Sequence, residues 1–148
     1  MDTTLAYIIV PMLKLLKEKK HGAPMVDAKD VPKELRPSKE EIERHNIDGE
    51  TDPNFIKRWE WVMDEMIFAF ESRLIDWEDQ FYTGQHDVIT VPVDGNGNEV
   101  PEDEAVVFEW RKGPNDTFKV DRKGLEAYQK RIDNGFKLFG KYYLSLWD

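Results

Sequence analysis

The sequence predicts an α+β fold in which three principal helices form the core and a small antiparallel β-meander is inserted before the C-terminal helix. Three stretches, residues 2–20, 52–77 and 121–146, carry apolar side chains at the three- and four-residue spacing of one helix face. Between the last two, Val88–Val93 alternates in the manner of a strand, and Gly- and Asn-containing turns separate it from two further strand candidates within residues 86–120. A length of 148 residues suits a single domain, 1–148.

The first predicted helix covers residues 2–20. Pro11 lies inside its apolar pattern, so we expect it to kink the helix or to mark its true beginning. Residues 22–52, with three Pro and two Gly, are predicted to form a long loop. Within that loop Ser38 and Glu41 have the spacing of a capping box, which predicts a short helix from residue 39 to about 46.

The central helix, residues 52–77, is predicted to organise the fold, with Asp52 as its N-cap and Pro53 in its first position. One stripe is typical of a core-facing surface and consists of Trp59, Met63, Met66, Phe70 and Leu74. A second stripe consists of Arg58, Trp61, Glu65, Phe68, Ser72 and Ile75. The second stripe has two interpretations: further core with paired charges at its edge, or a subunit interface or ligand wall.

Three short strands are predicted after the central helix, at 88–93, 105–110 and 117–120, with turns at 95–98 and 113–116. The last helix is expected to be capped by Asp121 and to run to about Leu146. Gly135 and Gly140 each cost about 1 kcal/mol relative to Ala in a helix interior. We therefore expect another backbone to approach the helix closely at both glycines.

Composition and motifs exclude several functional classes. The chain has no Cys, so it has no disulfide and no thiolate metal site, and its longest apolar run, residues 5–13, is too short to cross a membrane. A net charge of −9 opposes direct nucleic-acid binding. The polar loop at 94–102 lacks the Gly and the Glu that a calcium loop requires, so a hairpin turn is predicted there. No metal-binding, phosphate-loop, dinucleotide or hydrolase motif is present, and no cofactor is expected.

Cations and aromatic rings on the second faces of the helices are the candidate ligand-binding residues. Their side chains can contact phosphate, stack on a flat ring or clamp a charge. The candidates are Lys20, His21, Arg58, Trp61, Glu65, Lys141 and Tyr142. These residues also have simpler interpretations. Lys20 can interact favourably with the dipole at the C-terminus of its helix, Tyr142 can belong to a core edge, and Glu65 can pair with Arg58 or Lys57.

The chain resembles a group of tailed-bacteriophage accessory proteins that has no established activity. The resemblance is carried by KHGAPMVD at 20–27, KRWEWVMDEMIFAFE at 57–71, EDQFYTG at 78–84 and DNGFKLFGKYYLSLWD at 133–148. It implies a viral protein that acts in the host cytoplasm on host machinery or host defence. Members often carry an extra N-terminal segment, so we expect this chain to lack whatever that segment contributes.

The leading functional hypothesis is a non-enzymatic protein that counters host defence by sequestering a small anionic ligand, such as a nucleotide immune signal. A homo-oligomer is expected to form the pocket. The first alternative is an acidic inhibitor that binds a host protein, as a mimic of nucleic-acid phosphate. The second is a nucleotide hydrolase without a known motif, in which Asp64 and Glu65 supply the carboxylates. Neighbouring helical residues point about 100° apart, which makes this second alternative the weakest.

Overall fold

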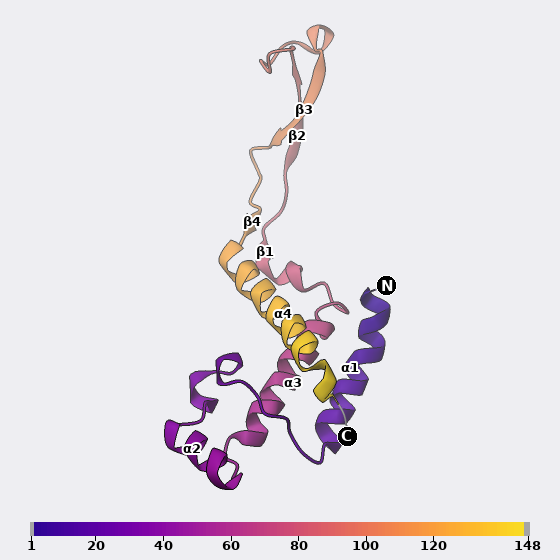
Figure 1. Ribbon diagram of the computed structural model, residues 1–148. Coiled ribbons are helices and arrows are strands. Elements are labelled where there is room, and N and C mark those ends of the chain that lie inside the picture. Colours follow the sequence, from indigo (N-terminus) through magenta and orange to yellow (C-terminus); the bar gives the residue numbers. More distant parts are fainter. Residues whose placement is uncertain (1, 147–148) are drawn as a thin grey trace. The chain divides into compact units, whose positions relative to one another are not determined.

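The structure is a computed structural model that describes residues 2–146 (Figure 1). It divides into two compact units, a helical unit made of residues up to 77 together with those from 126 onward, and a ribbon unit, residues 78–125. Both helices and antiparallel strands are present, as the α+β prediction requires. The assignment of 1–148 to one domain stays a prediction, and each unit is described by itself.

The helical unit is built on α3 (Phe55–Glu71), against which α1 (Asp2–Lys19) packs (Figure 1). α1 is continuous through Pro11, whose side chain is exposed, so the alternative that Pro11 marks the beginning of the helix is wrong. α3 begins at Phe55 rather than at Pro53, and its N-cap residue is Asn54. Asp52 still stabilises the turn before the helix, because its side chain accepts a hydrogen bond from the N–H of Asn54 at 2.9 Å.

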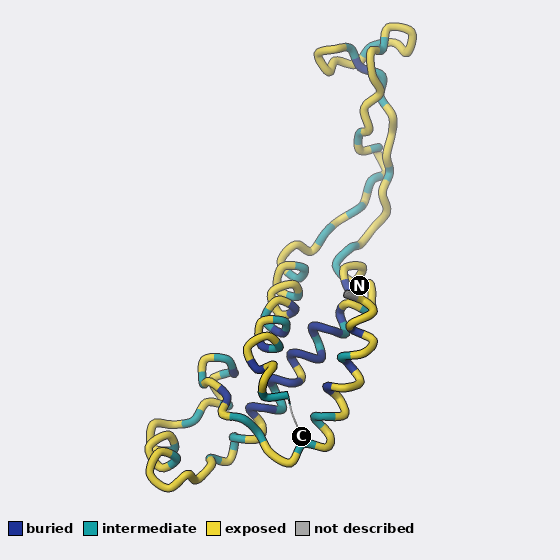
Figure 2. Tube along the Cα trace, turned by 45° about the vertical axis from the view of Figure 1, so that its right-hand side comes forward, coloured by how far each residue is buried: buried dark blue, intermediate teal, exposed yellow. Residues whose placement is uncertain are grey.

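The core lies along α3, most of whose inward side is buried (Figure 2). Trp59, Met63 and Met66 are each at most 2% exposed. α1 adds Ala6, Val10 and Leu13, and α4 (Arg122–Tyr142) adds Leu138 and Tyr142. The second stripe of α3 is also largely covered within the chain, since Arg58, Glu65 and Ser72 are buried.

Gly135 is the point at which α4 approaches the backbone of α3. A Cβ atom added at Gly135 would lie 2.2 Å from the carbonyl oxygen of Glu65 and 2.5 Å from the Cβ atom of Ala69. The predicted close approach is therefore confirmed at Gly135. It is wrong at Gly140, where such a Cβ atom would have no neighbour within 4 Å.

The long loop between α1 and α3 is ordered by local bonds and by two buried valines. The capping box of α2 (Lys39–Asp48) is confirmed, because the Ser38 N–H donates to Glu41 Oε2 at 2.7 Å and the Glu41 N–H donates to Ser38 Oγ at 3.2 Å. We call residues 20–37, which precede α2, the strap. Val26 and Val31 of the strap are 5% and 3% exposed, so the strap is part of the core.

The ribbon unit contains two separate two-stranded sheets. β2 (Val88–Val93) pairs antiparallel with β3 (Val107–Lys112), and β1 (Tyr82–Thr83) pairs with β4 (Lys119–Val120). The predicted strand at 117–120 is reduced to β4, which pairs with β1 and not with β3. The strands therefore do not form a three-stranded meander. The predicted turn at 95–98 is confirmed: Asp94 Oδ1 accepts the N–H groups of Asn96 at 2.8 Å and Asn98 at 3.0 Å.

Candidate functional site

The strap is attached to the end of α4 by a polar cluster around Tyr142. The Tyr142 hydroxyl donates to Asp30 Oδ2 at 2.8 Å and accepts the N–H of Asp27 at 3.0 Å. Lys141 Nζ contacts the carboxylates of both Asp27 and Asp30. Burial acts to raise the pKa of Asp30, but the hydrogen bonds from Lys141 and Tyr142 outweigh it and hold that pKa below its ordinary value. Hydrogen bonds to Asp27 and Asp30 raise the pKa of Lys141.

A buried ion pair joins the beginning of α3 to the strap. Arg58 donates to Asp52 Oδ1 at 2.9 Å and Oδ2 at 2.5 Å, and to the carbonyl of Leu35 at 3.0 Å. The side chains of Arg58 and Asp52 are only 3% and 8% exposed. The hydrogen bond from Arg58 is the main reason why the pKa of Asp52 lies below its ordinary value.

Glu65 is paired with a residue that the sequence analysis did not single out. Arg131 of α4 donates to Glu65 through Nη2 at 2.7 Å and through Nε at 3.0 Å, and its guanidinium lies 3.7 Å above the Phe68 ring. The predicted pairing of Glu65 with Arg58 or Lys57 is therefore wrong. The true partner is 66 residues away in the sequence, so no local spacing could have indicated it.

The other predicted residues are distributed over different parts of the helical unit. Lys20 Nζ binds Glu60 Oε1 at 2.8 Å and the carbonyl of Lys17 at 3.0 Å, whereas His21 is exposed. Lys20, Arg58, Glu65, Lys141 and Tyr142 are thus all held by groups of the same chain. Their role in ligand binding stays a prediction. Among the seven candidates, Trp61 lines a pocket in the helical unit.

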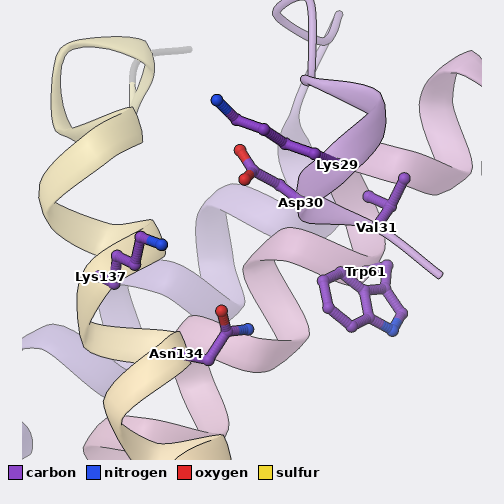
Figure 3. Close-up of a pocket in the computed structure, with 6 residues that line it drawn as sticks. All are labelled: Lys29, Asp30, Val31, Trp61, Asn134 and Lys137. Atoms are coloured by element: carbon purple, nitrogen blue, oxygen red, sulfur yellow. The ribbon is translucent and has the colours of Figure 1, made fainter.

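The pocket around Trp61, which we call the Trp61 pocket, is an open cavity of about 510 Å³ in the helical unit. Figure 3 shows the indole of Trp61, from α3, and the side chains of Asn134 and Lys137, from α4, bordering the same space as the Asp30 carboxylate. Lys29, Asp30 and Val31 of the strap complete the lining. Three segments that are distant in the sequence therefore meet at one half-buried aromatic ring.

The charges around this pocket favour an anion, although the chain as a whole is acidic. The Asp30 carboxylate is already bound by Lys141 and Tyr142, and Lys29 lies 3.8 Å from Asp27. Lys137 makes no ion pair within the described chain. Its ammonium is the cation most available to a ligand. Lys137 lies four residues before Lys141, on the same side of α4, which is the sequence signal that could have identified it.

A second open pocket lies beside α1 and α3, and its charges are already compensated. Its lining consists of Lys14, Lys17, Glu18, Asp64, Ile67 and Glu71. Lys14 pairs with Glu71 and Lys17 pairs with Asp64, each at 2.5 Å. Because Asp64 pairs with α1 and Glu65 pairs with α4, these neighbouring carboxylates do not share a site. This geometry counts against a two-carboxylate hydrolase.

No protein-family model, curated protein or solved structure matches the chain. Within residues 2–146, no helix combines the length and the apolar character needed to span a bilayer. The same described residues contain no cluster of three His, Cys, Asp or Glu side chains that could hold a metal ion. The resemblance to phage accessory proteins therefore stays a prediction, and the last two residues that carry it, Trp147 and Asp148, lie outside the described part.

Proposed function

We propose that this chain is a non-catalytic binding protein whose Trp61 pocket holds a small anionic ligand with a flat ring, such as a nucleotide. The observation that carries the proposal is the position of a half-buried indole beside two exposed lysines, Lys29 and Lys137, in one cavity. If the chain is a phage accessory protein, such a site would sequester a nucleotide immune signal in the host cytoplasm and so counter host defence.

The chemistry of the pocket matches the two parts of a nucleotide. Stacking of a base on an aromatic side chain is worth about 1–3 kcal/mol and tolerates different bases. The Lys29 and Lys137 ammonium groups can bind phosphate, and the Asn134 amide can both donate to and accept from a base edge. A cavity of about 510 Å³ also lies within the range usual for small-molecule sites.

Binding without turnover is supported by the state of the nearby carboxylates. Asp30 is held by Lys141 and Tyr142, and the pKa of Asp30 lies below its ordinary value, so it stays ionised and does not act as a proton donor near neutral pH. Asp64 and Glu65 are each paired with a different helix. These contacts fix the carboxylates in structural roles.

The test is calorimetric titration of the protein with linear and cyclic mono- and dinucleotides, followed by chromatography of the mixture. We expect one nucleotide class to bind and to be recovered intact. Lys137→Ala and Trp61→Leu should each weaken binding by about fivefold to a hundredfold, since each removes roughly 1–3 kcal/mol of phosphate or stacking contact. Lys130→Ala removes an exposed lysine two turns earlier on α4 and should leave the affinity unchanged.

Two results would contradict the proposal. Equal affinities for the wild type, Lys137→Ala and Trp61→Leu would place the ligand elsewhere. Release of a cleaved product would make the protein a hydrolase rather than a sequestering protein.

The alternative, an acidic inhibitor of a host protein, is favoured by one feature of the ribbon unit. Residues 94–104 contain five acidic residues and no basic one. A complex held by these charges should weaken steeply as salt rises, whereas a nucleotide stacked in the Trp61 pocket should be less sensitive. Affinity measured at two salt concentrations separates the two functions.

A further inference from the structure

The β2–β3 ribbon carries an apolar face that no other part of the ribbon unit covers. Opposite residues in an antiparallel pair lie on the same face, and successive residues alternate between faces. The pairing of Thr90 with Trp110 therefore defines one face, which we call the Trp110 face. It consists of Val88, Thr90 and Pro92 of β2 with Phe108, Trp110 and Lys112 of β3. Val88, Phe108 and Trp110 are 52%, 48% and 81% exposed.

The opposite face of the ribbon is covered or paired within the chain at two of its positions. Arg111 on that face binds Glu99 at 2.7 Å and Glu109 at 3.0 Å. Val93, also on that face, is fully buried and forms a bridge with Glu99 of the turn. Ile89 and Val107 of that face are still 41% and 52% exposed, so the two faces differ in their aromatic side chains: Phe108 and Trp110 both lie on the Trp110 face.

A two-stranded ribbon with an uncovered aromatic face is at best marginally stable in water, and exposed apolar patches of this kind mark interaction sites. We propose that the Trp110 face is a homodimer interface, in which the ribbons of two copies pack face to face across a two-fold axis. This proposal goes beyond the Trp61 pocket and is independent of it, because no residue that lines the pocket belongs to the ribbon unit.

The distribution of charge favours a second copy as the partner. The middle of the Trp110 face is uncharged, so it can meet an identical surface without repulsion. Glu102, Asp103 and Glu104 lie in the turn at one end of the ribbon. Lys112 lies at the other end, where it is 78% exposed and 3.9 Å from the carboxylate of Asp116. In an antiparallel two-fold pair, the acidic turn of each ribbon lies over the Lys112 end of its partner, whereas a parallel pair would bring the two acidic turns together.

The exposed area of the Trp110 face approaches that of a small specific dimer interface. Phe108 and Trp110 leave about 300 Å² exposed on each ribbon, given roughly 150–250 Å² for a whole aromatic side chain. Two ribbons together therefore offer roughly 600 Å² from the rings and about 800–900 Å² once Val88 and Pro92 are included, and Thr90 and Lys112 extend this toward the usual lower limit of about 1,000 Å² for a biological interface.

Cysteine cross-linking tests the predicted contact directly, because the chain has no Cys of its own. Thr90 lies near the middle of the paired register on the Trp110 face, so Thr90→Cys should form a disulfide-linked dimer on mild oxidation. Ile89→Cys, on the opposite face and 41% exposed, is the matched control. It should run as a monomer on a gel without reducing agent. Cross-linking of the Ile89→Cys variant but not the Thr90→Cys variant would overturn the proposal.

Sedimentation equilibrium gives the corresponding affinities. We expect the wild type to dimerise at micromolar concentration and Trp110→Ser to raise the dimer dissociation constant by roughly a hundredfold, since two central aromatic contacts are lost per dimer. Ile89→Ser should change it less than threefold. Lys112→Glu reverses an exposed charge and also removes the 3.9 Å contact of Lys112 with Asp116. It should raise the dissociation constant about tenfold at low salt, and it keeps the test valid if Trp110→Ser disturbs the ribbon.

Two outcomes of the sedimentation experiment would overturn the proposal. A wild type that is monomeric at about 100 μM would overturn the proposal, because the proposal predicts dimers at micromolar concentration. A dimer that survives both Trp110→Ser and Lys112→Glu would use a different surface, such as the exposed Leu5, Ile8 and Met12 of α1.

Discussion

At the scale of single residues, the helical unit uses charged side chains as connections between segments that are distant in the sequence. Arg58 joins α3 to the strap, Arg131 joins α4 to α3, and Lys141 joins α4 to the strap. Removing one partner of a buried pair leaves the other charge uncompensated in a poorly solvated site. These residues therefore matter for stability in proportion to their burial, whatever they contribute to binding.

Asp52→Asn tests the most buried of these pairs. We expect it to reduce the free energy of unfolding at pH 7 by about 3 kcal/mol, because Arg58 keeps its charge and loses its carboxylate partner. Chemical denaturation followed by circular dichroism measures this loss. Glu43→Gln, an exposed carboxylate of α2 for which no ion pair is shown, is the control and should lie within about 0.5 kcal/mol of the wild type.

The same pair makes a prediction about pH. The pKa of Asp52 and that of Asp30 are lower in the folded chain than their ordinary value of 3.8. Lowered carboxyl pKa values contribute stability that is fully present above the ordinary value and is lost as the pH falls through the folded-state value. We expect unfolding midpoints to be constant from pH 7 to about 5 and to fall below pH 4. Asp52→Asn should show a smaller fall, and an equal fall in both proteins would exclude Asp52 as a contributor.

At the scale of elements, the two glycines of α4 show how the same residue type has opposite consequences in one helix. Gly135 is needed because α3 lies directly against it, so its cost in helix propensity is offset by close packing. Gly140 has open space where a side chain would lie, and its cost is not offset by any contact.

Alanine substitution at each glycine separates the two cases. Gly140→Ala should stabilise the protein by about 0.5–1 kcal/mol through helix propensity. Gly135→Ala should destabilise it by roughly 2–4 kcal/mol, because the new methyl group would overlap the Glu65 carbonyl and force α3 and α4 apart. Thermal or urea unfolding of the two variants is the measurement. A stabilising Gly135→Ala would show that the helices can separate at little cost.

At the scale of the whole molecule, burial is unevenly divided between the two units. The helical unit contains a continuous apolar core, whereas Val93 is the one buried residue of the ribbon unit, all of which the structure describes (Figure 2). Local stability follows buried apolar contact, so the ribbon unit is expected to open at lower free energy than α3.

Amide hydrogen exchange checks this difference. In dilute protein, peptides covering residues 88–112 should exchange much faster than peptides covering α3 (Phe55–Glu71). If the Trp110 face dimerises, protection of the ribbon should rise with protein concentration while that of α3 stays constant. Equal protection of the ribbon and α3 in dilute protein would contradict the uneven division of stability.

Local patterns in the sequence were sufficient for the features that depend on neighbouring residues. The helical stripes, the capping box at Ser38, the turn at Asp94 and the need for Gly135 all follow from contacts or conformations within a few residues, or from a cost that only close packing can offset. Tertiary structure alone decided the pairing of Glu65 with Arg131, the pairing of β4 with β1 and the meeting of Lys29, Trp61 and Lys137 in one cavity. These contacts join residues tens of positions apart, and their geometry depends on how whole helices and strands pack rather than on any local spacing.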